Sequence, residues 1–249
     1  MMALEAIIFD VDGTLADTEE VHRRAFNDVF AARRLGWKWT REDYTKLLDV
    51  TGGKERIARF MRDWLWRDPA EIDIQALHRE KTERYVELVA GGALSLRPGV
   101  ARLIDEALAA GVKIAIATTT SLENVEVLIA RALGKAMLAE FAVISAGDMV
   151  ERKKPAPDVY EHALAAMRIP AAAAIAIEDS ANGLRSALAA GVPCIITTNP
   201  YTEDQEFAGA LAVLDSLGEA DKPAAASAGR MPPGVVANLA YLRSIHAAA

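Results

Sequence analysis

Short apolar segments that alternate with helical patterns constrain the fold of this chain more than any other feature. The apolar segments cover residues 6–9, 112–118, 141–145, 174–177 and 194–198, and their lengths suit buried strands. Helical patterns lie between and beside them at residues 99–110, 123–133, 159–167 and 184–190. Strands that alternate with helices predict a parallel sheet covered on both faces, so we expect an α/β fold with a doubly wound, Rossmann-like core.

The interval between the first two apolar segments differs, because it contains helical patterns alone. These cover residues 22–34, 41–48, 54–65 and 74–90, and the four tryptophans of the chain lie among them: Trp37, Trp39, Trp64 and Trp66. We predict a core formed by residues 1–15 and 95–249, with a helical cap domain of residues 16–94 inserted after the first strand. Hinges are expected at residues 16–18 and 95–98, where the cap would close and exclude bulk water.

Composition limits the class of protein and its partners. The chain has 249 residues, of which 52% are hydrophobic, enough for a sizeable core. Its net charge of −7 argues against nucleic-acid binding, and it has neither an apolar run of membrane-spanning length nor the basic start of a secretory signal. We therefore expect a cytoplasmic monomer with no nucleic-acid or membrane partner. Its single cysteine, Cys194, excludes an intramolecular disulfide and is predicted to be a buried, inert thiol.

Two carboxylates follow the first apolar segment directly. Asp10 and Asp12 stand at the end of the predicted strand, and Gly13 allows the backbone to turn immediately after them. Close carboxylates in a partly buried pocket repel each other, so the pair favours a bound cation. Mg²⁺ suits oxygen ligands and attracts phosphate, which indicates phosphoryl chemistry. For this segment alone, an ordinary Asp-Gly turn remains the alternative.

Three later segments carry the other groups that phosphoryl chemistry needs. They are TTTS at residues 118–121, KKPAPD at residues 153–158 and EDSANG at residues 178–183. Hydroxyls before a helix can hold phosphate oxygens, a lysine supplies positive charge, and the acids can complete a metal site. Taken singly, the same segments are a hydroxyl-rich helix cap, a solvated lysine pair and a helix start that favours acids. Because the ends of parallel strands share one edge of the sheet, the segments can converge in space.

In this order, the four segments resemble the signature motifs of the haloacid dehalogenase superfamily of phosphatases and phosphomutases. The resemblance implies that Asp10 attacks phosphorus and forms an aspartyl-phosphate. It implies that Asp12 protonates the leaving oxygen and later activates water. Thr118 would bind the transferring phosphoryl group. Lys154, with Lys153 as the other candidate, would neutralise charge on the nucleophile and the phosphate.

The resemblance also implies a Mg²⁺ site. Its ligands would be the carboxylate of Asp10, the backbone carbonyl of Asp12 and the carboxylate of Asp179, with Glu178 acting through the outer shell. The resemblance then narrows to the CbbY-like sugar bisphosphate phosphatases, a group related to beta-phosphoglucomutase. The segments DGTLADTEEVHRRAFN, TGGKERIARF, IATTTS, KKPAPD and IEDSANG carry it over residues 4–200. It implies that one phosphate is removed from a ketopentose bisphosphate, the usual substrate of the group being xylulose 1,5-bisphosphate.

A substrate with two phosphates requires two cradles, one in the core and one in the cap. The core cradle would consist of Thr118, Thr119, Thr120 and Lys154, next to Asp10. The cap would clamp the distal phosphate through Lys81 and through the loop of Gly52, Gly53, Lys54, Glu55 and Arg56. Glu19 and His22 on the first cap helix are expected to reach the substrate, Glu19 as an acceptor for a sugar hydroxyl. Without the rest of the chain, the loop is equally an ordinary helix start with solvated charges.

Other functions stay open at this point. A sugar phosphomutase would use the same nucleophile but return the phosphate to its product, and a broad phosphatase would accept small monophosphates such as phosphoglycolate. A catalytically idle phospho-sugar sensor is disfavoured, because binding alone requires neither Asp10 nor Asp12. In the tail after Asp221, residues 223–229 are predicted to form a loose connector and residues 235–246 a terminal helix, and no function is assigned to either.

Overall fold

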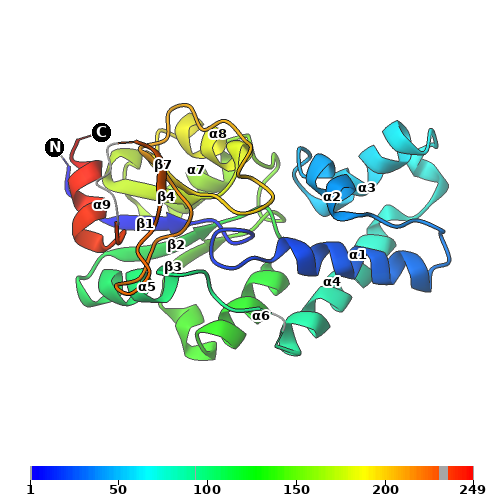
Figure 1. The fold of residues 1–249 in the computed structure, drawn as a ribbon, viewed down its shortest axis with the longest axis horizontal. Coiled ribbons are helices and arrows are strands. Elements are labelled where there is room, and N and C mark those ends of the chain that lie inside the picture. Colours follow the sequence, from blue (N-terminus) through cyan, green and yellow to red (C-terminus); the bar gives the residue numbers. More distant parts are fainter. Residues whose placement is uncertain (1, 93, 230–234, 249) are drawn as a thin grey trace.

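In the computed structural model, which describes residues 2–92, 94–229 and 235–248, a seven-stranded sheet lies between two layers of helices (Figure 1). The strand order is β3-β2-β1-β4-β5-β6-β7. Parallel pairs join the sheet from β3 to β6, and β7 pairs antiparallel with β6. The strands are β1 (Ala6–Phe9), β2 (Lys113–Ala117), β3 (Phe141–Ser145), β4 (Ala174–Glu178), β5 (Cys194–Thr197), β6 (Ala212–Leu214) and β7 (Ala226–Gly229).

The predicted doubly wound α/β core is confirmed, and its first five strands lie where the apolar segments predicted them. β6 is an addition, and it was missed because it has only three residues. The prediction of a loose connector at residues 223–229 is wrong, since Ala226–Gly229 forms the edge strand β7. Its small, exposed side chains carry no apolar pattern, so backbone pairing with β6 defines this strand.

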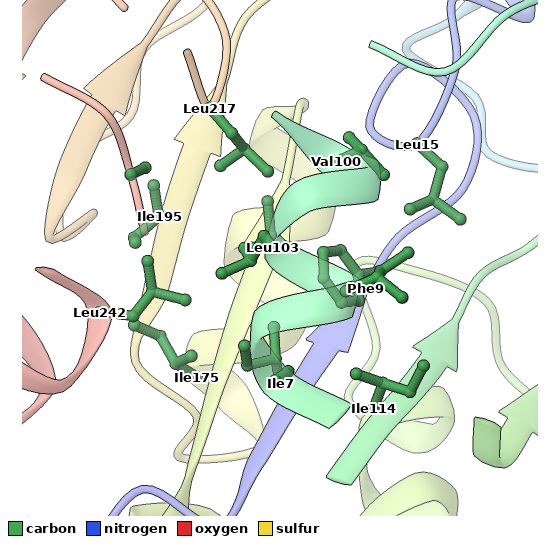
Figure 2. Close-up of a cluster of buried hydrophobic side chains, with 14 of the residues drawn as sticks. Ile7, Phe9, Leu15, Val100, Leu103, Ile114, Ile175, Ile195, Leu217 and Leu242 are labelled. Atoms are coloured by element: carbon green, nitrogen blue, oxygen red, sulfur yellow. The ribbon is translucent and has the colours of Figure 1, made fainter. Parts of the chain in front are cut away.

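Alternate side chains of the strands pack against opposite helix layers. On one face, Ile7 and Phe9 join Ile114 and Ile175 in a large apolar cluster under α5 (Val100–Ala109), α6 (Leu122–Ala132) and α9 (Leu239–His246) (Figure 2). On the other face, mostly smaller side chains contact α7 (Asp158–Met167) and α8 (Ala181–Ala189). Burial on both faces explains why the strands are continuously apolar. Cys194 is buried on the second face, as predicted.

Helices alone fill the described chain between β1 and α5. They are α1 (Glu19–Ala32), α2 (Arg41–Leu47), α3 (Gly53–Arg59) and α4 (Ile74–Ala90), with a π-helical turn at Phe60–Trp64 and a 3₁₀ turn at Pro69–Glu71. Phe26, Phe30, Trp37 and Trp39 contribute to an aromatic core that belongs to these helices, whereas Trp66 is 88% exposed. On the basis of this separate core we propose residues 16–94 as the cap. Further 3₁₀ turns, Lys135–Ala139 and Ala171–Ala173, lie in the core.

The two connections between cap and core run side by side. Ala16 and Leu96 form an antiparallel bridge, and the backbone N–H of Arg97 donates to the carbonyl of Leu15 over 2.8 Å. The cap also rests on the core through α4, which packs against α6. These contacts hold the cap helices over the end of the sheet where the strands β1, β2 and β4 finish (Figure 1). Among the helices described here, none is long and apolar enough to cross a bilayer.

Candidate active site

A cavity of about 520 Å³ lies between the cap and the carboxyl ends of the strands. The predicted site residues that line it are Asp10, Asp12, Glu19, His22, Gly52, Gly53, Lys54, Arg56, Lys81, Thr118, Thr119, Thr120, Lys154 and Asp179. Glu55 and Glu178 do not line it. The parallel sheet brings the core residues together because Asp10, Thr118 and Asp179 each follow the end of a strand.

Lys154 connects two acids at the base of the cavity. Its ammonium nitrogen lies 2.6 Å from Oδ1 of Asp10 and 2.6 Å from Oε1 of Glu178, and it donates to the carbonyl of Ala117 over 2.8 Å. Tyr160 also donates to Oε1 of Glu178, over 2.5 Å. Asp10, Lys154 and Glu178 are all buried. Lys154, rather than Lys153, is therefore the lysine beside the predicted nucleophile.

The acids at this point fit a divalent cation. Carboxylate oxygens of Asp10, Glu178 and Asp179 lie within 4.8 Å of one another, and all three residues are buried. Burial raises the pKa of Asp10 to about 8, with Glu178 and Asp12 acting in the same direction and Lys154 opposing them. Burial and the neighbouring carboxylates likewise raise the pKa of Asp179 well above its usual range. Clustered buried carboxylates of this kind favour a hard cation such as Mg²⁺, which would stabilise their charged forms.

The side chain of Asp12 is directed to the first cap helix. Thr18 donates to its Oδ1 over 2.6 Å, and Nε2 of His22 lies 2.9 Å from the same oxygen. On the other side of the imidazole, Nζ of Lys81 lies 2.6 Å from Nδ1. Burial opposes ionisation of Asp12, but His22, Thr18 and Lys81 outweigh it and hold the pKa of this carboxyl below its usual range. Asp12 is thus the core carboxylate that contacts the cap.

The hydroxyl-rich segment forms the turn between β2 and α6. The backbone N–H of Thr118 donates to the carbonyl of Ser145 over 2.9 Å, and the N–H of Thr120 donates to the hydroxyl of Thr118 over 3.3 Å. The backbone of Thr119 packs against Gly147, where a Cβ atom would lie 2.2 Å from the carbonyl oxygen of Thr119. The loop is therefore held in a fixed shape with its threonines on the cavity wall.

The glycine loop of the cap is packed more tightly than the sequence suggested. A Cβ atom on Gly53 would lie 2.5 Å from Nε2 of His78, and one on Gly52 would lie 2.2 Å from Oε2 of Glu55. Glu55 forms an ion pair with Lys153 of the core, with 3.0 Å between Nζ and Oε1. The two glycines therefore leave space for the side chains of His78 and Glu55. Glu55 contacts the core and does not line the cavity.

The two cations of this loop differ in their surroundings. Lys54 is partly exposed on the cavity wall. Arg56 is buried and donates to the hydroxyl of Tyr44 over 2.8 Å and to the carbonyls of Leu47 and Val50. Its guanidinium carbon also lies 4.9 Å from the centre of the Tyr44 ring. Arg56 therefore organises the cap from within, whereas Lys54 is the more accessible cation.

Sequence reasoning missed residues that the structure brings to the site. His78 lines the cavity one helical turn before Lys81, and burial, with Lys81, Lys54 and Lys153, lowers its pKa to about 3. His78 and Lys81 are three residues apart on α4, and this spacing places them on the same face of the helix. Asn199 follows β5 and donates to Oδ2 of Asp179 over 2.7 Å. Extending the rule about strand ends to the fifth strand would have found it.

Comparisons with known proteins show the family to which the chain is similar. A family model described as haloacid dehalogenase-like hydrolase matches residues 4–191. The protein CbbY of Cereibacter sphaeroides is 56% identical over 216 residues, which cover 87% of this chain and 94% of that protein.

Two solved structures are similar over the same extent. The crystal structure of CbbY from Rhodobacter sphaeroides in complex with phosphate has a TM-score of 0.82 and 56% identity, covering 86% of this chain and 94% of that one. A D10N mutant of that protein, in complex with xylulose-(1,5)bisphosphate, has a TM-score of 0.82 and 55% identity with the same coverage.

Proposed function

The chain belongs to the haloacid dehalogenase-like hydrolase family, and we therefore propose that it is a Mg²⁺-dependent phosphatase that removes one phosphate from a sugar bisphosphate. The observation that carries this proposal is the position of Asp10. Its carboxylate lies at the base of a cavity with Lys154 against one oxygen, below a cap that contributes further cations. A buried carboxylate beside an ammonium group is suited to attack phosphorus while the charge of the phosphate is offset.

The first step would transfer the phosphoryl group to the protein. A carboxylate oxygen of Asp10 forms a bond to phosphorus while the bond from phosphorus to the sugar oxygen breaks, and Asp12 donates its proton to that departing oxygen. The negative charge of a bound phosphate beside Asp12 favours the protonated form that this step needs. Thr118 would hold a phosphoryl oxygen during the transfer, while the positive charge of Lys154, whose three donors contact Asp10, Glu178 and Ala117, would offset charge on the phosphate.

The second step would regenerate the acid and the nucleophile. Asp12, now a carboxylate, takes a proton from water as the water oxygen attacks phosphorus. The bond between phosphorus and the oxygen of Asp10 then breaks, and inorganic phosphate leaves. Mg²⁺, held by Asp10, Asp179 and the carbonyl of Asp12 with Glu178 outside them, would supply positive charge that stabilises the phosphoryl oxygens. Lys154 and Tyr160 hold Oε1 of Glu178, so its buried Oε2 would be the oxygen that faces the cation, through a water molecule.

The cap supports a second anion site at a distance from Asp10. Lys54 is the accessible cation of the glycine loop, and His78 and Lys153 line the same cavity. Burial, followed by the charges of Lys81, Lys54 and Lys153, lowers the pKa of His78, and a distal phosphate would offset those charges. Glu19 lines the cavity next to the hinge and is proposed to accept a hydrogen bond from a sugar hydroxyl. Because the similar CbbY protein was solved in complex with xylulose-(1,5)bisphosphate, this sugar is the first substrate to test. The proposed product is xylulose 5-phosphate.

A phosphate-release screen with Mg²⁺ tests the proposal. It compares ketopentose bisphosphates, the corresponding monophosphates and phosphoglycolate, and a coupled assay looks for an isomerised monophosphate in each reaction. We expect kcat/KM for the bisphosphate to exceed that for any monophosphate by at least about tenfold, since a second charged contact is worth about 1.4 kcal/mol or more. Equal rates on phosphoglycolate would make the protein a broad phosphatase, and an isomerised product would make it a mutase.

A further inference from the structure

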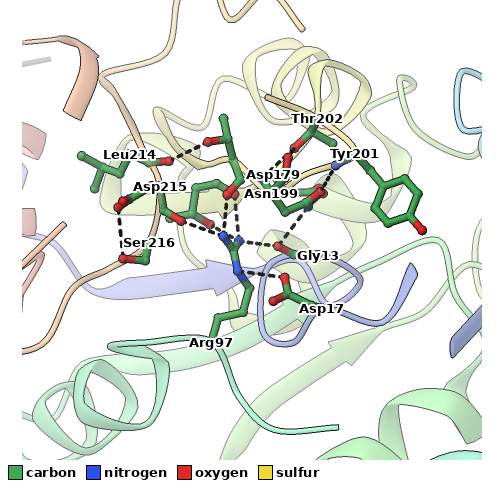
Figure 3. Close-up of polar contacts among 12 residues, drawn as sticks. Gly13, Asp17, Arg97, Asp179, Asn199, Tyr201, Thr202, Leu214, Asp215 and Ser216 are labelled. Carbon is green, nitrogen blue, oxygen red and sulfur yellow. Dashed lines mark hydrogen bonds and ion pairs between the residues drawn. The ribbon is translucent and has the colours of Figure 1, made fainter. Parts of the chain in front are cut away.

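Asn199 lies in the turn after β5, where its side-chain amide contacts Asp179, one of the predicted metal ligands. Its Nδ2 donates to Oδ2 of Asp179 over 2.7 Å, and the same nitrogen lies 3.4 Å from the carbonyl oxygen of Gly13 (Figure 3). Asn199 and Asp179 are both buried. One carboxylate oxygen of Asp179 is thus engaged by protein, which leaves Oδ1 for a cation.

The orientation of this amide is fixed from its other side. The backbone N–H of Tyr201 donates to Oδ1 of Asn199 over 2.8 Å, so the NH₂ group must be the end that contacts Asp179. Gly13 is required at the same point, because a Cβ atom there would lie 2.2 Å from Oδ2 of Asp179 and 2.5 Å from Nδ2 of Asn199. Arg97 holds the turns on both sides, donating to the carbonyls of Gly13, Thr197 and Thr198.

Tyr201 connects this turn to the cap. Its hydroxyl donates to Oε2 of Glu20 on α1 over 2.9 Å, and its ring meets the ring of Tyr44 edge-on with 6.1 Å between centroids. The guanidinium of Arg41 lies 5.0 Å above the same ring. Tyr201 is therefore a core residue whose side chain contacts the cap while its backbone fixes the Asn199 amide.

We propose that residues 199–201 form a positioning turn, in which Asn199 orients Asp179 for the cation and Tyr201 ties that orientation to the cap. The inference rests on the proposed Mg²⁺ site and adds two positioning residues to it. A hydrogen-bond partner behind a metal ligand restricts the carboxylate to one rotamer, and its loss commonly weakens metal binding by about 10- to 100-fold. The contacts of Tyr201 with Glu20 and Tyr44 connect this turn to the cap, and the hydrogen bond from Asn199 connects it to Asp179.

Binding of Mn²⁺ to the full chain without substrate, followed by electron paramagnetic resonance, tests the first part. Asn199→Ala is expected to weaken Mn²⁺ binding by about 10- to 100-fold and to raise the Mg²⁺ concentration for half-maximal activity in the same proportion. KM for substrate at saturating Mg²⁺ should change little. Asn238→Ala is the matched control, because Asn238 caps α9 far from the site and its loss costs stability alone. Unchanged Mn²⁺ affinity in Asn199→Ala would overturn the inference.

A double-mutant cycle tests whether Tyr201 acts through Asn199. Tyr201→Ala should weaken Mn²⁺ binding several-fold in the wild-type background and have no further effect when Asn199 is already alanine. Additive effects, or no effect of Tyr201→Ala alone, would refute the connection to the cap. Wild-type protein that binds no Mn²⁺ would instead refute the metal-dependent function, so the two failures are distinguishable.

Discussion

Nζ of Lys81 lies 2.6 Å from Nδ1 of His22, on the far side of the imidazole from Asp12. Since Nε2 faces a carboxylate, the hydrogen belongs on Nε2, and Nδ1 accepts from Lys81. The ring of His22 is also stacked on Tyr85 with 4.1 Å between centroids. The imidazole is thus held on three sides and presents one donor to Asp12.

Replacing Lys81 with methionine is expected to reduce kcat/KM by about 10- to 100-fold, the usual cost of losing a group that orients a reacting residue. Burial lowers the pKa of Lys81 to about 7. In the free wild-type enzyme, kcat/KM should therefore decrease as the pH rises through about 7 and the ammonium group loses its proton. Lys81→Met should lack this limb of the pH profile. Lys46→Met, on an exposed cap position, serves as the control.

Asp10→Asn is expected to abolish phosphate release, by about 10⁴-fold or more, because an amide cannot form the aspartyl-phosphate. The chain should nevertheless fold, because the amide reduces repulsion in the acid cluster and Lys154 keeps Glu178 as a buried charged partner. Activity and circular dichroism measure the two parts. Asp105→Asn, an exposed position on α5, should retain full activity. Phosphate release by Asp10→Asn would exclude Asp10 as the nucleophile.

In metal-free protein, the buried carboxyl of Asp10 should make the free energy of unfolding depend on pH. Burial raises its pKa from 3.8 to about 8, so the folded chain retains a proton that the unfolded chain loses between about pH 4 and pH 8. The free energy of unfolding of metal-free protein should therefore decrease across this window through this group. Excess Mg²⁺ should raise Tm more at about pH 8 than at about pH 5, because the cation binds the ionised carboxylate.

Thermal unfolding in EDTA and in Mg²⁺ at each pH measures this effect. Asp10→Asn provides the comparison, since it lacks the titrating carboxyl and should show a weaker dependence in the metal-free state. A Tm gain from Mg²⁺ that is equal at both pH values, and equal in the variant, would argue that the cation binds elsewhere.

The sequence predicted the core of the sheet well because burial on both faces leaves a direct trace in the amino acids. Ile7 and Phe9 pack on one layer while Ala6 and Ile8 pack on the other, so every position of β1 is apolar. β7 has no such apolar pattern, since its small side chains are exposed and pack against neither helix layer. An edge strand of this kind is determined by backbone pairing with its neighbour.

The convergence of the core acids was predictable for a related reason, since the ends of parallel strands share an edge. What sequence could not predict is the direction in which neighbouring charged side chains point. Glu55 and Arg56 are adjacent, yet one pairs with Lys153 across the cap boundary and the other is buried under Tyr44. That difference depends on how α3 packs in the cap, which no local pattern specifies.

The accessible Lys54 should distinguish substrates by their second phosphate. Lys54→Met is expected to raise KM for a sugar bisphosphate by about 10-fold or more through the lost charge-assisted contact, while KM for a monophosphate stays within about twofold. Kinetics on both substrates measure this, with Lys46→Met as the control. An equal rise in both KM values would place Lys54 at the transferring phosphate instead.

Arg56 should behave differently, because its donors are already engaged inside the cap. Arg56→Met is expected to lower the free energy of unfolding by about 2–4 kcal/mol, since it leaves the carbonyls of Leu47 and Val50 and the hydroxyl of Tyr44 without their charged donor. Urea denaturation measures the loss, and Arg62→Met, at an exposed position of the same segment, should cost less than about 0.5 kcal/mol. A variant of Arg56 that keeps full stability but has a raised KM for bisphosphate alone would show that this guanidinium turns into the cavity to bind substrate.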